Sequence, residues 1–481
     1  MFRLFCRILF PVLFTIFYSS ISHADDKVKP FESNNGYEPS KQEYDGPKFK
    51  LSHNYPNSYK PAENMPWRSS IKNEHITINN AGIYTEALKE AVSKDMRVLI
   101  QNYAEWNAEE RGWYNEPWLG RASKDNLKPG DKDPNPSLRE AIHGMYVGNS
   151  LLDKNLFKGT GLKKNFTTYV LTYYDEVAAQ TLHKVWGKDA QNPNIDKVSS
   201  QFLEGSLIVK AAFTTAGPEN WTAMKGSQAW PLFISVDATK NKNDNAVLPP
   251  KVTQLYFMQF DIIVKDSKSS PKTGWVFTTL VYDVNASGKD VWDKMVPLGA
   301  QWGNDPDINS LNNPKAKLLE NWINPKAPKY AKMTLGWGGR LSGPNDGAVN
   351  DIVYQDKNGK NVYVKNAQNS GCMSCHSTAQ WDSKAKYEMR SFLLPATEMP
   401  AKRDKNFLVS PASGSMAWMK WFQSNPGYVP MDAGSIAFDY DMVFTFKSFP
   451  FWLSAKTNKK HFLMGVDRSG KGLINMNYNG K

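Results

Sequence analysis

The sequence predicts an α+β protein in which a β-rich N-terminal part, an antiparallel sandwich or open barrel with flanking helices, precedes a mainly helical domain. Three observations predict this arrangement. Segments rich in β-branched and aromatic residues follow one another between residues 206 and 282. Segments with helical periodicity precede them. The chain of 481 residues is long for one core, and its only Cys-x-x-Cys-His pentapeptide lies well beyond the strands, at residues 372–376.

Residues 1–24 are predicted to be a secretory signal peptide. Arg3 and Arg7 precede an apolar run, and residues 22–24 (Ser-His-Ala) form a small-x-small cleavage site. A membrane anchor is the alternative, but the apolar run is short and Pro11 interrupts it. We therefore expect an exported protein without a stable membrane span after cleavage.

Residues 25–66 and 67–330 are expected to be a flexible linker and an α+β domain, respectively. The linker is rich in Asn, Pro, Lys, Ser and Tyr and has no apolar periodicity. A second helix of the domain is expected to run from Asp175, as its N-cap, to Trp186, with Gly187 ending it. The first helix has apolar residues at spacings of three and four, namely Leu88, Val92, Met96, Leu99 and Tyr103.

Four segments of this domain have the composition of strands. They are residues 206–215, 230–236, 252–264 and 275–282. The first alternates apolar and other residues, and the last two are separated by a loop rich in Ser, Lys and Pro. Such a loop fits a long hairpin, so an antiparallel sandwich or open barrel is the simplest arrangement.

The pentapeptide Cys372-Met373-Ser374-Cys375-His376 has the spacing for covalent attachment of one haem c. Each thiol forms a thioether with a haem vinyl group. The next residue then lies beneath the ring, which predicts His376 as the proximal iron ligand.

Three other interpretations of the two cysteines remain open. A thioredoxin-type redox pair normally needs a βαβ setting, which the surrounding sequence does not show. Half of a zinc site would need more Cys or His ligands, yet no cysteine besides these two follows residue 24 and no histidine lies between His183 and His376. A disulfide across two intervening residues would be strained.

The sixth iron ligand is not decided by the sequence. Met431 is the first candidate, because it follows Pro430 in a rigid loop 55 residues after His376 and a methionine often supplies this ligand. His143 and His461 are the other candidates. An iron without a sixth protein ligand is also open.

On the pentapeptide the chain resembles c-type cytochromes. The resemblance implies that Cys372 and Cys375 attach the haem, that His376 binds its iron, and that residues 331–481 form a mainly helical, cytochrome c-like haem domain. Haem attachment of this kind follows export in bacteria, so the resemblance implies a periplasmic or secreted protein. Four further segments are similar to secreted bacterial proteins described only as cytochrome c-like, namely residues 273–277, 281–283, 301–305 and 336–341.

Charge and length bear on function. Beyond residue 24 the chain has 57 basic and 47 acidic residues, a net charge of +10, and its lysines are scattered. We expect an acidic periplasmic redox partner and no nucleic-acid binding. One-electron transfer is the predicted function. The alternative is a haem enzyme or sensor with an open distal site for peroxide or nitrogen-oxide chemistry, using His143 or Arg340 as the polar distal group. Whether the protein is an enzyme stays open.

Overall fold

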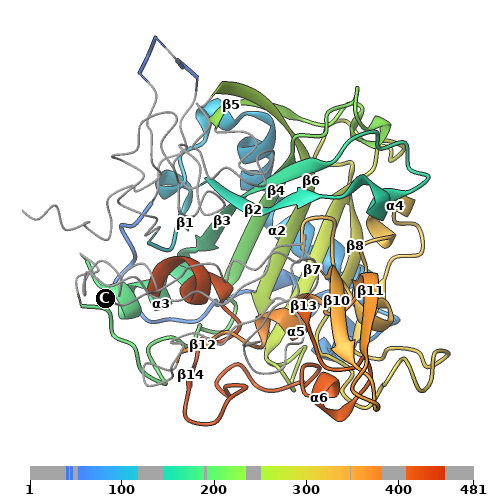
Figure 1. The fold of residues 1–481 in the computed structure, drawn as a ribbon. Coiled ribbons are helices and arrows are strands. Elements are labelled where there is room, and N and C mark those ends of the chain that lie inside the picture. The colour runs from blue at the N-terminus through green and yellow to red at the C-terminus, as the bar shows by residue number, and fades with distance from the viewer. Residues whose placement is uncertain are drawn as a thin grey trace, which may run out of the picture.

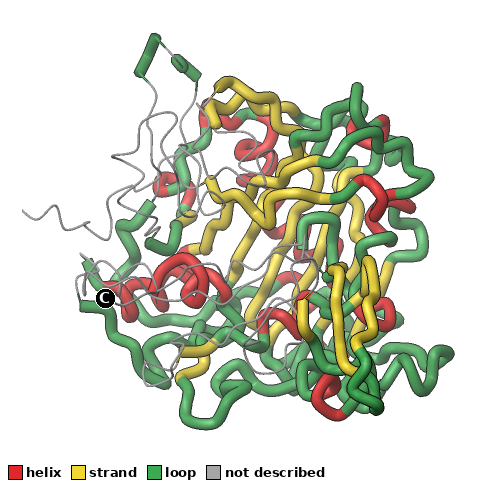
Figure 2. Tube along the Cα trace, viewed as in Figure 1, coloured by secondary structure: helices red, strands yellow, loops and turns green. Residues whose placement is uncertain are grey.

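A large twisted antiparallel sheet crosses the molecule, with a long helix against one face and the C-terminal segments against the other (Figure 1). The computed structural model describes residues 40–42, 44–46, 52–117, 145–188, 192–234, 251–346, 348–381 and 408–449. Strands occupy the centre of the molecule, and most of the helices are short (Figure 2). No helix among these residues is long and apolar enough to cross a membrane.

The large sheet has nine described strands, and every pairing in it is antiparallel. Its order is β1-β3-β4-β6-β7-β8-β9, with β2 paired to β3 and β5 to β6. The strands are β1 (Trp113–Tyr114), β2 (Met145–Leu152), β3 (Phe166–Asp175), β4 (Leu207–Thr214), β5 (Ala229–Ile234), β6 (Lys251–Lys265), β7 (Trp275–Tyr282), β8 (Met295–Gln301) and β9 (Asn321–Ile323).

The helices predicted for this part are present. Helix α2 (Ala81–Gln101) includes Leu88, Val92, Met96 and Leu99 of the expected apolar stripe, whereas Tyr103 lies in the 3-10 turn after it. Helix α3 (Glu176–Trp186) begins where the Asp175 side chain accepts a hydrogen bond from the Ala178 backbone N–H at 2.8 Å. Gly187, with φ of +67°, ends α3. Helix α1 (Pro66–Ser69) precedes them, and short 3-10 turns lie at Lys72–Glu74, Tyr103–Glu105, Glu109–Arg111, Lys154–Phe157, Thr222–Met224 and Trp337–Gly339.

The two faces of the sheet differ in chemistry because neighbouring side chains of a strand point to opposite faces. One face is apolar: Val209 and Ile262 are paired across β4 and β6 and belong to the core that includes α2. On the other face, Lys210, Asp261 and Thr279 form one row across β4, β6 and β7. The C-terminal segments cover this second, partly polar face.

The predicted fold class is wrong, because no mainly helical domain follows the sheet in the described residues. The helices there are one turn each, α4 (Lys329–Lys332), α5 (Cys372–His376), α6 (Met416–Met419) and a π-helical turn at Phe444–Ser448. Strands β10 (Val349–Gln355), β11 (Asn361–Gln368) and β13 (Leu408–Val409) form a second sheet, and β12 (Gln380–Trp381) pairs with β14 (Ile436–Ala437). The sandwich or open barrel is replaced by one nine-stranded sheet.

A hairpin signal in the sequence explains part of this difference. Asn358-Gly359 lies between two segments of alternating character, and Gly359 has φ of +74°, as such a turn requires. Ile352 and Val353 pair with Val364 and Tyr363 on the two sides of the turn. Local strand preference therefore determines this segment.

The described part of the segment predicted as a linker contacts the core. Tyr55 is buried, and its hydroxyl donates a hydrogen bond to the Asn115 carbonyl at 2.5 Å. The Asn115 side chain in turn accepts a hydrogen bond from the Ser52 backbone N–H at 3.0 Å. These contacts hold residues 52–55 beside β1.

We expect Phe260→Ala to lower the free energy of unfolding by about 3–5 kcal/mol, because a fully buried ring would leave a cavity. Phe260 packs edge-on against Trp292, with ring centroids 5.0 Å apart, on the apolar face of the sheet. The measurement is urea denaturation followed by fluorescence. Tyr363→Ala on the exposed surface of β11 is the control and should change stability far less. Equal losses would contradict this assignment of the core.

Candidate functional site

The Cys-x-x-Cys-His pentapeptide forms one helical turn, α5, that begins after Gly371. Residues at positions i, i+3 and i+4 of a helix share one face, so Cys372, Cys375 and His376 lie on the same side of this turn. The turn is fixed from its other side: Met373 is buried, and its backbone N–H donates to the Gln301 side chain on β8 at 3.1 Å. A single turn thus brings the side chains of both cysteines and the histidine to one face.

The glycine-rich loop before the pentapeptide holds the start of α5. The Trp337 backbone N–H donates to the Ser370 carbonyl at 2.7 Å. At Gly336 the two backbones are so close that a Cβ atom would lie 1.7 Å from the same carbonyl oxygen. Glycine is needed there for space, because any side chain would push Ser370 and Gly371 away.

Arg340 of this loop is a structural residue. It is fully buried, and its guanidinium donates hydrogen bonds to the backbone carbonyls of Asn304, Trp337, Asp305 and Ile308. Burial lowers the pKa of Arg340 to about 10. Four of its five N–H groups are engaged with carbonyls, so Arg340 is not available as the polar distal group of the alternative function.

His376 is held in one tautomer. Its Nδ1 lies 2.8 Å from the carbonyl oxygen of Tyr440. Because a carbonyl can only accept, Nδ1 carries the proton, and Nε2 keeps a lone pair to which no described residue donates a hydrogen bond. Burial lowers the pKa of His376 to about 4, so the ring is neutral near pH 7. A neutral imidazole with its second nitrogen bonded to a carbonyl is the usual form of a metal-binding histidine.

An aromatic side chain from the sheet also orients this ring. Phe277 of β7 packs edge-on against His376, with ring centroids 4.7 Å apart. The hydrogen bond to Tyr440 and the contact with Phe277 together restrict rotation of the imidazole ring. The orientation of His376 is therefore set by the protein before any ligand binds.

The two thiols are uncharged and are not bonded to each other. Burial raises the pKa of Cys375 to about 12 and that of Cys372 well above its usual value. Both cysteines are free, although part of each side chain remains accessible. A redox-active Cys-x-x-Cys pair needs a lowered thiol pKa, so these properties count against the thioredoxin-type interpretation. The strained disulfide is not present.

A charged cluster lies beside the first cysteine. The Cys372 sulfur is 3.8 Å from an Asp346 carboxylate oxygen, and Lys210 bridges Asp346 at 2.9 Å and Asp261 at 2.7 Å. Burial raises the pKa of Asp261 to about 6, although the charge of Lys210 acts in the opposite direction. This cluster cannot be predicted from the sequence, because Lys210 and Asp261 lie inside strands and only the pairing register of the strands brings them opposite each other.

Of the predicted sixth ligands, only Met431 lies among the described residues. Met431 is half-buried and packs against a separate cluster that contains Trp337, Trp418 and Phe422. Met373 and Phe277, next to His376, belong to a different cluster. The other two candidates, His143 and His461, lie outside the described residues.

Comparisons with known proteins add no further constraint on the site. No protein-family model matches the chain, and neither a curated protein nor a solved structure does. In the part of the chain that the structure describes, no three or more His, Cys, Asp or Glu side chains are grouped so as to hold a metal ion. The chemistry of the site must therefore be argued from Cys372, Cys375 and His376 and from what surrounds them.

The chain beyond the Tyr440 carbonyl is anchored by two buried carboxyl groups. The Tyr174 hydroxyl lies 2.8 Å from Asp441 Oδ2 and 3.1 Å from Glu116 Oε2. The Tyr174 hydroxyl has one proton and can donate it to only one of the two carboxyl groups. The other carboxyl group can bond to the Tyr174 oxygen only as a donor, so the arrangement favours its protonated form. Burial raises the pKa of Asp441 to about 6 and that of Glu116 well above its usual value.

We expect Asp441→Asn to weaken the pH dependence of stability between about pH 4 and 6. A carboxyl whose pKa is raised in the folded state binds more protons there than in the unfolded chain, so wild-type stability falls as the pH rises through this window. The asparagine amide can donate to the Tyr174 oxygen, whose hydroxyl then donates to Glu116. The measurement is urea denaturation at several pH values, with the exposed Glu90→Gln as control. An unchanged slope in Asp441→Asn would contradict the assignment.

Proposed function

We propose that the protein binds one haem c through Cys372 and Cys375, with Nε2 of His376 as an axial iron ligand, and acts in one-electron transfer. The observation that carries the proposal is the His376 side chain, whose Nδ1–H donates to the Tyr440 carbonyl while Nε2 keeps a lone pair. His376 and both cysteines lie on the same face of one helical turn. This donor set fits the proposed group.

The protein's own residues have defined tasks in this proposal. The bound haem would supply an iron that gains and loses one electron. Burial keeps His376 neutral, and Tyr440 and Phe277 orient its ring; neither task requires a proton to move. The thiols are uncharged and would be consumed in the thioether bonds. No nucleophile or general base is required, which distinguishes electron transfer from most enzymatic reactions.

The scaffold proposed for this haem is an antiparallel sheet with short covering segments. The pentapeptide lies against β8 through the Gln301–Met373 hydrogen bond and against β7 through Phe277. These contacts place the motif on the sheet face that also bears Lys210 and Asp261. The haem would therefore be attached close to a polar part of a β-rich domain.

We further propose that the protein is exported to the periplasm or secreted, where haem c is attached, and that it meets an acidic redox partner. The apolar segment before residue 24 and the net charge of +10 beyond it support these two points.

A second function is favoured by the position of Met431. It packs against the cluster that contains Trp337, Trp418 and Phe422, which is different from the cluster next to His376. An iron without a sixth protein ligand would be open to small molecules, as in a haem enzyme or sensor acting on peroxide or nitrogen oxides. The Lys210–Asp261–Asp346 cluster beside Cys372 would then supply polar groups near the haem edge.

We expect the wild-type protein, produced with an export signal in a host that attaches haem c, to retain haem through denaturing electrophoresis. The double variant Cys372→Ser/Cys375→Ser should lose this covalent haem, because a hydroxyl does not form the thioether. Met373→Leu is the matched control, since Met373 is buried on the opposite side of the same turn. The measurement is haem staining of the gel. Wild-type protein without covalent haem would contradict the proposal.

We expect the optical spectrum of the reduced protein to separate the two functions. A low-spin spectrum that carbon monoxide does not change indicates a firm sixth ligand and supports electron transfer. A spectrum that shifts with carbon monoxide indicates an open site and supports the enzyme or sensor. If the spectrum is low-spin, Met431→Ala tests the ligand: conversion to a carbon monoxide-binding form identifies Met431, and an unchanged spectrum excludes it.

A further inference from the structure

The backbone that accepts the His376 hydrogen bond has an unusual conformation. Asp439 and Tyr440 are consecutive residues with positive φ, +47° and +69°, and neither is glycine. Residues other than glycine rarely adopt this left-handed backbone conformation, and two such residues in succession persist only where surrounding contacts hold them. The conformation directs the Tyr440 carbonyl toward His376, 64 residues earlier in the chain.

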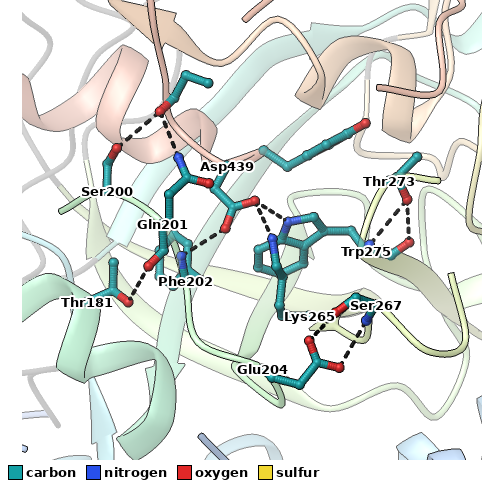
Figure 3. Close-up of polar contacts among 12 residues, drawn as sticks. Thr181, Ser200, Gln201, Phe202, Glu204, Lys265, Ser267, Thr273, Trp275 and Asp439 are labelled. Atoms are coloured by element: carbon teal, nitrogen blue, oxygen red, sulfur yellow. Dashed lines mark hydrogen bonds and ion pairs between the residues drawn. The ribbon is translucent and has the colours of Figure 1, made fainter. Parts of the chain in front are cut away.

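The Asp439 side chain is what holds this turn. It is fully buried, and Figure 3 shows donors converging on its carboxylate. One oxygen accepts from Lys265 Nζ at 2.6 Å and from Trp275 Nε1 at 2.7 Å, and the other accepts from the Phe202 backbone N–H at 2.8 Å. These donors come from β6, from β7 and from the segment after α3.

The chain on either side of Asp439 is attached to the same surroundings. Ser200 and Gln201 donate side-chain hydrogen bonds to the Ala437 carbonyl, at 3.1 and 3.2 Å (Figure 3). The Phe438 backbone N–H donates to the Ala379 carbonyl at 2.9 Å, three residues after His376. Residues 437–440 are therefore fixed relative both to the sheet and to the helical turn that bears the cysteines.

A glycine provides the space that the Asp439 carboxylate occupies. At Gly427 a Cβ atom would lie 1.7 Å from Asp439 Oδ1 and 3.2 Å from Trp275 Nε1. The glycine thus allows the carboxylate and the indole N–H to meet. The backbone at Gly427 thus lies directly against the contact between Asp439 and Trp275.

We infer that Asp439 is a positioning residue for the haem ligand: by fixing the left-handed turn at 439–440, it keeps the Tyr440 carbonyl on Nδ1–H of His376. The inference rests on the proposed function, since its consequence is for iron bound at Nε2. An imidazole that donates its Nδ1–H to a carbonyl while Nε2 binds the iron is a stronger electron donor, and it favours the oxidised iron. Loss of the turn should therefore make the reduction potential more positive.

A change in charge could also shift the potential, so the test needs a neutral variant. Asp439→Asn removes the negative charge opposite Lys265 as well as loosening the turn. Trp275→Phe removes one of the three hydrogen bonds to Asp439 without changing any charge. If Asp439 positions the turn, the reduction potential changes in the same direction in both variants. If only its charge matters, the reduction potential changes in Asp439→Asn alone.

A second buried carboxylate provides the matched control. Asp266 is also fully buried and ion-paired, with Arg68 at 2.7 Å, and it accepts a hydrogen bond from the Tyr84 hydroxyl at 2.7 Å. The partners of its side chain, Arg68, Tyr84 and Ser269, lie outside the segment around Tyr440. Asp266→Asn should therefore destabilise the protein as Asp439→Asn does, but leave the haem ligand unaffected.

The experiment measures the reduction potential of the haem-loaded, full-length variants and the Nδ1–H resonance of His376 in protein labelled with ¹⁵N-histidine. We expect a more positive potential and faster exchange of the Nδ1 proton with solvent in Asp439→Asn and Trp275→Phe, and neither change in Asp266→Asn. Wild-type values in both Asp439→Asn and Trp275→Phe would overturn the inference, as would a shift in Asp439→Asn alone. A wild-type protein without haem would instead overturn the proposed function, which is a distinguishable result.

Discussion

The hydrogen bond from His376 Nδ1 to the Tyr440 carbonyl is the interaction on which the arrangement of the C-terminal part depends. It joins the helical turn that bears the cysteines to a segment 64 residues later. The acceptor is held in place at a cost, because each left-handed residue that is not glycine costs roughly 1–3 kcal/mol. Buried hydrogen bonds of Asp439 to Lys265, Trp275 and Phe202 offset that cost.

The sheet can hold the acceptor of this hydrogen bond in place because its two faces have different roles. The apolar face packs against α2 and contributes most of the large core. The other face carries buried charges, which would destabilise the fold by several kcal/mol each if they were unpaired. They are paired: Lys265 with Asp439, and Lys210 with Asp261 and Asp346. Each of these ion pairs ties a strand of the sheet to a covering segment or to a neighbouring strand, so the polar face specifies where the covering segments lie.

The sequence predicted what depends on neighbouring residues. The Asp175 cap and Gly187 stop of α3 and the strand at 275–282 both follow from local sequence. It did not predict what depends on register and distant contacts, such as the Lys210–Asp261 pair or the carbonyl acceptor at Tyr440. The mainly helical domain is wrong for another reason: it is implied only by a resemblance, whereas the Asn358-Gly359 turn in the same region favours a hairpin locally.

The pentapeptide motif therefore does not determine the fold that surrounds it. Positions i, i+3 and i+4 coincide on one face of any helical turn, so the pentapeptide needs only five helical residues and not a helical domain. Orientation of the histidine needs only a carbonyl at hydrogen-bond distance, and here a strained turn docked on a sheet supplies it. A sequence motif of this kind can predict chemistry while leaving the fold undetermined, because the same site can be built on unrelated folds. The long-range contacts of Asp439 are what adapt this motif to a β-sheet.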